Sequence, residues 1–212
     1  MRIDKIVARQ GPVEVTFGQP VLQRFNQELS GREILSVDSR GKALLTSFEG
    51  GLTVYSHNQL YGRWYLVRQG KLPKTNRSLR LALHTSTHSA LLYSASEIAV
   101  LTEEELLAQP YLAKLGPDAL DEDVPWRDIL QRLMSSRFRR RSLAALYLDQ
   151  GFVAGIGNYL RTEILHKCKL NPFDRPADLT RKQLGLLART TLELTRQAYI
   201  TSGVTNSPGR VK

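Results

Sequence analysis

The spacing of the apolar residues changes once along this chain, and that change constrains the fold more than any other feature. From Arg32 to about Val100 short apolar runs are separated by turn residues such as Gly50-Gly51, which favours an antiparallel sandwich or barrel. After Pro117 the apolar residues repeat about every 3.6 residues, as in packed helices. We therefore predict an α+β protein, with an antiparallel β-sandwich domain over residues 1–116 and an all-α domain over residues 117–212.

The individual elements follow from the same patterns. The predicted strands are Ile34–Val37, Ala43–Phe48, Leu52–Tyr55, Arg63–Val67, Leu79–Leu83 and Ala90–Ser94. The predicted helices are Pro125–Met134, Ser142–Leu148, Asn158–Lys167 and Asp178–Ile200. In the last helix, we expect a buried stripe formed by Leu184, Leu187, Leu192 and Leu194.

The charge of the chain favours a polyanionic partner. Lys and Arg together number 30 against 20 Asp and Glu, which gives a formal net charge of +10. The sequence has no apolar run long enough for a transmembrane helix and no apolar core of a signal peptide, so we expect a cytoplasmic protein without membrane contact. Cys168 is the only cysteine and the histidines are widely spaced, so we expect no internal disulfide and no metal.

The first local motif is Ser39-Arg40-Gly41-Lys42, in which a glycine lies between two cations and between two predicted strands. Glycine permits a close approach of the backbone, and a lysine ammonium extends outward, so the motif suits a bound phosphate. A charged hairpin turn explains the same residues, and the motif taken alone favours that interpretation.

The second motif, Tyr55 to Gly62, collects aromatic and hydrogen-bonding residues directly after a predicted strand. Leu60 or Tyr61 at its tip would fit between two bases while Gln59 hydrogen-bonds a base edge, as in proteins that kink DNA with apolar wedges. A strand end whose polar groups are satisfied internally is the alternative. The residues favour neither interpretation over the other.

The third motif, Gly155 to Arg161, begins with two closely spaced glycines. Asn158 is expected to cap the helix that follows, and a helix N-terminus with free amides suits a phosphate. An ordinary helix-turn-helix has the same features. A cluster of cations lies just upstream: Arg137, Arg139, Arg140 and Arg141. Such a run is more often a solvated face than a binding site.

Taken together, the motifs resemble the formamidopyrimidine-DNA glycosylase and endonuclease VIII family, and most closely its endonuclease VIII branch. The resemblance runs from about residue 2 to about residue 207 and rests on these strings: R-G-K-A-L-L (40–45), Y-S-H-N-Q-L-Y-G (55–62), L-Y-S-A-S (92–96), G-P-D (116–118), L-D-Q (148–150) and G-I-G-N-Y-L-R (155–161). It implies a two-sheet β-sandwich, then a helix-two-turns-helix domain and, in most members, a zinc finger.

The resemblance also implies a set of functional residues, with Lys42 as catalytic and with Gln59, Leu60, Tyr61, Lys114 and Asn158 as DNA-binding. In the family, the lysine contacts phosphate and is assigned proton donation during β-elimination. The three consecutive residues fill the gap left by a flipped-out nucleotide, and this triplet favours oxidised pyrimidines as substrates. The last two match contacts to the DNA backbone, and Glu163 in the same motif is interpreted as structural.

Two departures from the family pattern bear on the mechanism. Family members begin with Pro-Glu-Gly-Pro-Glu after the initiator methionine, and the proline amine is the nucleophile. A terminal amine has a pKa of about 8, against about 10.4 for lysine, so more of it is unprotonated at neutral pH. Position 2 here is Arg2, and the four cysteines of the family's zinc finger do not follow Asn206. We therefore expect a chain truncated at both ends, with no cofactor.

Three functional hypotheses follow. The first is a base-excision glycosylase and abasic-site lyase for oxidised pyrimidines, present here as an incomplete chain. The second is a catalytically inactive module that binds damaged DNA, and the third is an RNA-binding protein, against which the absence of an RNP motif argues. We expect a monomer that binds double-stranded DNA with oxidised bases or abasic sites, in the cytoplasm with the nucleoid. Lys42 or the Met1 α-amine would support weak lyase activity at most.

Overall fold

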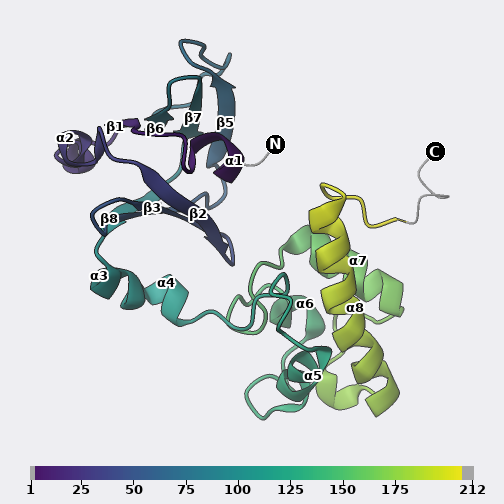
Figure 1. The fold of residues 1–212 in the computed structure, drawn as a ribbon. Helices are drawn as coiled ribbons and strands as arrows, with labels where there is room; N and C mark the ends of the chain where they lie inside the picture. Colours follow the sequence, from purple (N-terminus) through teal and green to yellow (C-terminus); the bar gives the residue numbers. More distant parts are fainter. Residues whose placement is uncertain (1–2, 207–212) are drawn as a thin grey trace. The chain divides into compact units, whose positions relative to one another are not determined.

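The structure is a computed structural model that describes residues 3–206, so Met1 and Arg2 lie outside the described residues. The chain divides into two compact units, Met1–Ala113 and Lys114–Lys212, which we call unit 1 and unit 2 (Figure 1). Each unit has a hydrophobic core of its own. The predicted boundary, after Gly116, lies close to this division.

Unit 1 contains two four-stranded antiparallel sheets (Figure 1). The strands are β1 (Glu14–Phe17), β2 (Ile34–Arg40), β3 (Ala43–Phe48), β4 (Thr53–His57), β5 (Arg63–Arg68), β6 (Leu79–His84), β7 (His88–Tyr93) and β8 (Glu97–Leu101). One sheet has the order β1-β6-β7-β5 and the other β2-β3-β4-β8. Side chains of both sheets form one core, including Phe17, Phe48 and Leu81. The predicted antiparallel sandwich is confirmed.

In the sheet β2-β3-β4-β8, the strands β3, β4 and β8 are packed on both faces. One face contributes Phe48 and Val54 to the sandwich core. Against the other face pack α3 (Glu103–Leu107) and α4 (Pro110–Ala113), where Tyr55 is buried and the half-buried Tyr111 packs against the same cluster. Every residue of β4 is consequently buried. The other helical segments of unit 1 are α1 (Asp4–Val7), the 3-10 helix η1 (Pro20–Leu22) and α2 (Phe25–Leu29).

Several elements of unit 1 were not predicted. Strand β1 alternates between exposed and buried residues but is only four residues long, which is a weak signal. Strand β8 is half-buried throughout and shows no alternation of apolar and polar residues. Helix α3 does carry a recognisable signal. The Thr102 side chain accepts from the Glu105 N–H, and the Glu105 carboxylate accepts from the Thr102 N–H, which is a capping box.

Unit 2 is all-helical. Its elements are α5 (Trp126–Met134), α6 (Leu143–Leu146), α7 (Asn158–Cys168), the 3-10 helix η2 (Pro176–Asp178) and α8 (Arg181–Ile200). Helices α5 and α7 both pack on α8 (Figure 1). The rings of Phe138 and Tyr147 lie edge-on to Phe152 at 5.3 and 5.4 Å. The buried Tyr147 hydroxyl is paired with Thr191 at 2.7 Å, so this aromatic core leaves no polar group of Tyr147 unsatisfied.

The last helix begins later than predicted, at Arg181 instead of Asp178. Pro176–Asp178 forms a separate 3-10 turn, and the Thr180 side chain caps α8 by accepting from the Gln183 N–H. The predicted buried stripe is confirmed, since its members are all buried: Leu184, Leu187, Leu192 and Leu194. Helix α6 ends at Leu146, earlier than predicted.

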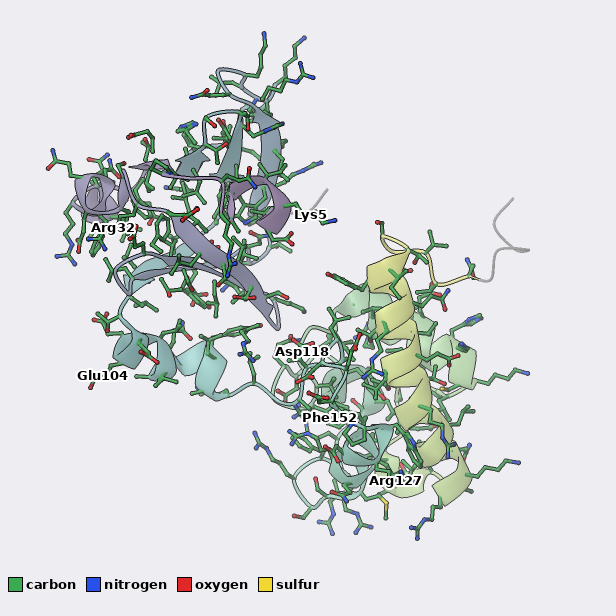
Figure 2. The ribbon with its side chains drawn as sticks, in the orientation of Figure 1. Lys5, Arg32, Glu104, Asp118, Arg127 and Phe152 are labelled. Atoms are coloured by element: carbon green, nitrogen blue, oxygen red, sulfur yellow. The ribbon has the colours of Figure 1, made fainter. Side chains whose placement is uncertain are left out.

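The surface of both units is rich in cations, and long side chains ending in nitrogen project outward from each of them (Figure 2). Between Ile3 and Asn206, no helix is long and apolar enough to cross a membrane. In the same part of the chain, no group of His, Cys, Asp and Glu side chains is arranged to hold a metal ion.

Gly185 in α8 offers a test of this packing. A Cβ atom there would meet only the Arg189 Nη1 atom, at 3.8 Å, which is an ordinary contact. Alanine loses less backbone entropy than glycine in a helix, so Gly185→Ala should raise the free energy of unfolding by about 0.5–1 kcal/mol in urea denaturation. Gly116→Ala should instead lower the free energy of unfolding, because its Cβ would lie 2.6 Å from the Phe152 carbonyl oxygen. Loss of stability in both variants would contradict the structure of unit 2.

Candidate nucleic-acid interface

Lys42 lies in the tight turn between β2 and β3. Arg40 pairs with Ala43 across the two strands, so the turn consists only of Gly41 and Lys42. Gly41 has a φ of 59° and Lys42 does not have a positive φ, a combination typical of a type II′ turn with glycine at its first central position. The hairpin interpretation of this motif is correct for the backbone. The turn places the lysine at the end of a two-stranded ribbon.

The environment of Lys42 changes its protonation. Its side chain lines a pocket of about 170 Å³ together with Ser56, Asn58 and Trp64. Although Lys42 is exposed as a residue, partial burial of its ammonium lowers the pKa of Lys42. Its backbone N–H donates to the Tyr111 hydroxyl at 3.0 Å, which attaches the turn to α4. A lower pKa increases the fraction of neutral amine, which is the nucleophilic form.

The loop of residues 58–62, between β4 and β5, carries two large side chains in solvent. Leu60 is 81% exposed and Tyr61 is 67% exposed. The base of the loop is closed by a hydrogen bond from the Gly62 N–H to the Asn58 carbonyl, at 2.7 Å. The Arg77 guanidinium also donates to the Tyr61 carbonyl. The two exposed side chains are therefore held on a constrained loop, an arrangement suited to an apolar wedge.

Gln59 is held in a conformation that non-glycine residues rarely adopt. Its φ is 51°, in the left-handed region, which is unfavourable by about 1 kcal/mol or more for a residue with a Cβ atom. Its N–H donates to His57 Nδ1 at 3.0 Å, and its side-chain Nε2 donates to Glu97 Oε2 at 2.6 Å. Strain of this kind persists where the surroundings fix it, and such positions cluster at functional sites.

Glu97 connects the loop to the sheet and to the helices. It pairs with His57 across β4 and β8 and accepts hydrogen bonds from three side chains. The donors are the Tyr55 hydroxyl at 3.2 Å, Gln59 Nε2 at 2.6 Å and Gln109 Nε2 at 3.4 Å. Burial, with a further contribution from the charge of Glu97, raises the pKa of Tyr55, so its hydroxyl stays a donor.

His57 fixes the backbone of the same loop. Its ring packs edge-on against Tyr111 with 4.8 Å between centroids. Burial lowers the pKa of His57, and the positive charge of Lys42 lowers it further, while Glu97 acts in the opposite direction. A neutral ring leaves a lone pair on Nδ1, and that lone pair accepts the Gln59 N–H.

In unit 2, Asn158 is the first residue of α7 and not its cap, so the predicted capping role is wrong. The N-cap is Gly157, whose extended backbone precedes the helix and which has no side chain to offer the first turn. The Asn158 Oδ1 atom accepts instead from the Arg161 guanidinium. Because no side chain caps α7, its first amides and the positive end of its dipole remain available to an anion.

The loop before α7 is held by side chains of unit 2. Gln150 Oε1 accepts from the Gly155 N–H at 3.0 Å, and Gln150 Nε2 donates to the Ile156 carbonyl at 2.8 Å. The Gly116 N–H donates to the Gln150 carbonyl at 2.9 Å, and Arg132 Nε donates to the Phe152 carbonyl at 2.8 Å. The strings G-P-D and L-D-Q therefore serve to position the start of α7.

The cations of unit 2 differ in their surroundings. Lys114, Arg139 and Arg140 are exposed. Arg141 instead forms an ion pair with Asp149, and this contact lowers the pKa of Asp149 although burial alone would raise it. The solvated-face interpretation of the arginine cluster thus does not hold for Arg141.

The predicted site residues fall into two groups, one in each unit. Lys42 and the loop carrying Gln59, Leu60 and Tyr61 belong to unit 1, where Lys42 and Asn58 line one pocket. Lys114 and Asn158 belong to unit 2. Glu163 accepts from the Thr205 hydroxyl at 2.9 Å and so ties α7 to the segment after α8, in line with its structural interpretation.

Sequence reasoning missed the residues that hold the site: Glu97, Gln109, Tyr111 and Gln150. Of these, Gln150 lies in the L-D-Q string, so the resemblance marked it without giving it a role. The other three have no local signal. These three residues lie near the loop only because β8 pairs with β4 and because α3 and α4 pack against the sheet.

The fold and this site define a two-unit protein with a β-sandwich, a helix-two-turns-helix unit and an exposed loop suited to nucleic acid. Residues 2–96 match the formamidopyrimidine-DNA glycosylase N-terminal domain, and residues 115–207 match the formamidopyrimidine-DNA glycosylase H2TH domain. The chain belongs to the formamidopyrimidine-DNA glycosylase and endonuclease VIII family of DNA repair glycosylases.

Individual relatives agree with this assignment. Endonuclease 8 of Escherichia coli is 47% identical over 190 residues, which cover 90% of this chain and 72% of that protein. Endonuclease 8 of Klebsiella pneumoniae is 43% identical over 203 residues, covering 96% and 77%. Lactococcus lactis Fpg, solved in a complex with DNA containing an abasic site, shares the fold with a TM-score of 0.80 at 20% identity, covering 95% and 76%.

The role of Glu97 is testable by substitution. Glu97→Ala should lower the free energy of unfolding by about 1–3 kcal/mol, because the buried Tyr55 hydroxyl loses its acceptor. Glu97→Gln keeps one carbonyl acceptor and should lose less. Urea denaturation of both variants measures the difference. Equal stability of Glu97→Ala and the unchanged chain would show that this network does not stabilise the loop.

Proposed function

We propose that the chain binds damaged duplex DNA and inserts the tip of the 58–62 loop at the lesion. The observation that carries this proposal is the constrained loop, which keeps Leu60 and Tyr61 in solvent although each would be more stable in an apolar environment. A base stack opened by loss of a nucleotide provides that environment. Gln59 would remain at the neck of the loop, where its amide lies within reach of a base edge once it leaves Glu97.

Phosphate contacts would come from unit 2. The uncapped start of α7 provides backbone amides, and Asn158 provides a side-chain amide beside them. Exposed Lys114, Arg139 and Arg140 add positive charge. Several structures of Lactococcus lactis Fpg with this fold are complexes with DNA that contains a damaged base or an abasic site, which supports the choice of partner.

The chemistry that we propose is abasic-site lysis through Lys42. The neutral Nζ would attack the aldehyde carbon C1′ of the open sugar, and loss of water would give a protonated imine. Removal of a C2′ proton would then expel the 3′ phosphate by β-elimination, and water would release the amine. The lowered pKa of Lys42 assists the first step, because only the unprotonated amine attacks.

Two functions are compatible with this site. One is a glycosylase and lyase that excises oxidised pyrimidines, and the other is a binding module without excision. The relatives named Endonuclease 8 and the Gln59-Leu60-Tyr61 triplet support the first. The second is favoured by the Lys42 pocket, since no acid is among the described residues that line it, and the nearby Glu97 is engaged by three donors. Multiple-turnover release of thymine glycol from a duplex distinguishes the two.

Borohydride trapping tests the role of Lys42. On duplex DNA with one abasic site, the chain should form a covalent adduct whose yield rises with pH, because deprotonation of Lys42 creates the nucleophile. Lys42→Ala and Lys42→Arg should both lose the adduct. Lys71→Ala, at an exposed lysine of another loop, is the control and should trap normally. An adduct that persists in Lys42→Ala would place the reactive amine elsewhere, with the Met1 α-amine as the next candidate.

Binding measurements test the wedge. The double variant Leu60→Ala and Tyr61→Ala should reduce the preference for abasic over intact duplex by about tenfold or more, since it removes two side chains that would be buried at the lesion. Its affinity for intact duplex should change little and should still fall steeply with salt. Fluorescence anisotropy at two salt concentrations measures both quantities. An unchanged preference for abasic DNA would exclude the loop as the lesion probe.

A further inference from the structure

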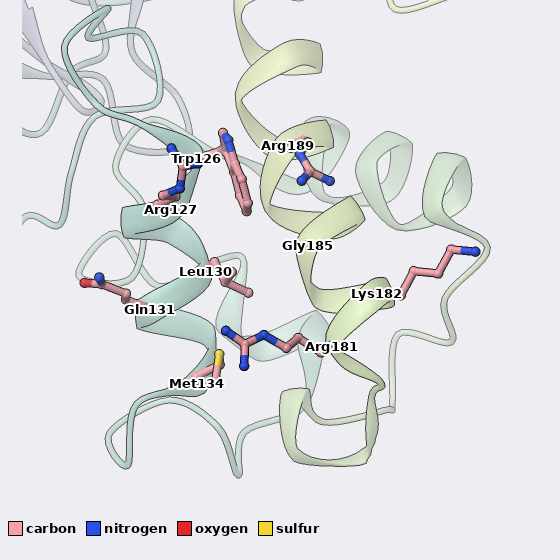
Figure 3. Close-up of a pocket in the computed structure, with 9 residues that line it drawn as sticks. All are labelled: Trp126, Arg127, Leu130, Gln131, Met134, Arg181, Lys182, Gly185 and Arg189. Atoms are coloured by element: carbon pink, nitrogen blue, oxygen red, sulfur yellow. The ribbon is translucent and has the colours of Figure 1, made fainter.

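A second cationic site lies on unit 2, in a pocket between α5 and the first half of α8 (Figure 3). The pocket has a volume of about 580 Å³, within the range of about 300–1,000 Å³ typical of ligand sites. Four cations line it: Arg127, Arg181, Lys182 and Arg189. The remaining lining is largely apolar and includes Trp126, Leu130 and Met134, and no acidic residue lines it.

Trp126 is the centre of this pocket. The guanidinium of Arg189 lies 4.0 Å from its ring centroid, and that of Arg127 lies 5.1 Å from it. Figure 3 shows the indole between α5 and α8, facing the same space as Leu130. Cation–π contacts leave the outward N–H groups of a guanidinium free to bind an anion. None of the four cations forms an ion pair with another residue in the described part of the chain.

This pocket is separate from the phosphate site proposed at the start of α7. The Tyr159 hydroxyl in the first turn of α7 is hydrogen-bonded to the Gly203 carbonyl and, at 2.9 Å, to Thr205, beyond the C-terminal end of α8. Arg189 lies eleven residues before Ile200, which is roughly 16 Å along the helix axis. The Thr180 side chain accepts from the Gln183 N–H at the start of α8, and the cations that line the pocket are side chains, so the pocket would hold an anion mainly with side chains.

We propose that this pocket binds a short acidic peptide segment of a partner protein, with one aromatic or aliphatic side chain placed against Trp126, Leu130 and Met134. The cations of α8 span Arg181 to Arg189, about 12 Å along the helix, which an extended segment of roughly four residues covers. A single phosphate reaches only one end of such a row. Duplex DNA offers charge but no apolar side chain for the floor of the pocket.

The experiment uses Trp126 as its own reporter. The chain has two tryptophans, and Trp64→Phe leaves Trp126 as the only one. The probe is the peptide Asp-Glu-Asp-Phe-Asp-Glu, titrated into this variant at low salt. Trp126 emission should change saturably. A peptide with serine in place of phenylalanine should bind about tenfold more weakly or worse, because it buries no ring.

Two pocket variants and one control locate the binding. Arg127→Glu with Arg181→Glu should weaken probe binding at least about tenfold through like-charge repulsion. Gly185→Leu fills the floor without changing charge and should also weaken probe binding. A Cβ at Gly185 makes only an ordinary contact, with Arg189 Nη1 at 3.8 Å, and circular dichroism checks that the leucine variant is folded. Lys71→Glu with Lys74→Glu makes the same charge change in an exposed loop of unit 1 and should retain affinity within about twofold.

Three outcomes would overturn the proposal. The first is no saturable change in Trp126 emission. The second is equal binding of the serine peptide, which would indicate charge attraction alone. The third combines two results. A short intact duplex competes with the probe, and the Arg127→Glu and Arg181→Glu variant loses as much affinity for the duplex as for the probe. Together these results would make the pocket part of the DNA surface. Retained duplex binding in that variant, with probe binding lost, supports a separate peptide site whatever the outcome at the 58–62 loop.

Discussion

Strand β4 is buried on both faces, so the polar groups of Tyr55, Ser56 and His57 must find partners inside unit 1. Glu97 on the neighbouring strand accepts from Tyr55, and it also accepts from Gln59 in the loop that follows. The network that satisfies the buried strand end is therefore the same network that fixes the loop. That coupling explains how Gln59 is kept at a positive φ while Leu60 and Tyr61 remain in solvent.

In unit 2, too, the residues that hold the loop are different from the groups that are available to bind a ligand. Its aromatic core around Phe152 and the side chain of Gln150 hold the loop that leads into α7. Gly157 then leaves the helix start uncapped and open. The first half of α8 differs, because its start is capped by Thr180 and its charge is carried by side chains beside Trp126. The two ends of one helix thus adjoin surfaces with different chemistry.

Family membership and activity rest on different observations. Matches over both units assign the chain to the formamidopyrimidine-DNA glycosylase and endonuclease VIII family. The activity that we propose depends on one amine, Lys42, whose pKa is lowered by its surroundings. A partly desolvated amine suits an aldehyde that already exists at an abasic site. Excision of a damaged base that is still attached to its sugar additionally requires a group that transfers protons. Glu97, a carboxylate hydrogen-bonded to the loop, already accepts from three side chains.

The sequence alone determined the division into a β unit and a helical unit, because apolar spacing and turn residues act over a few neighbours along the chain. It also determined the Gly41-Lys42 hairpin and the buried stripe of α8, for the same local reason. Local signals were ambiguous at Asn158, where a glycine one residue earlier took the cap position. Only the tertiary structure decided the partners of Gln59 and the tryptophan pocket of unit 2. Glu97 reaches the loop through strand pairing across forty residues of sequence, and Arg189 reaches Trp126 through the packing of α8 on α5, so neither contact leaves a pattern in adjacent residues.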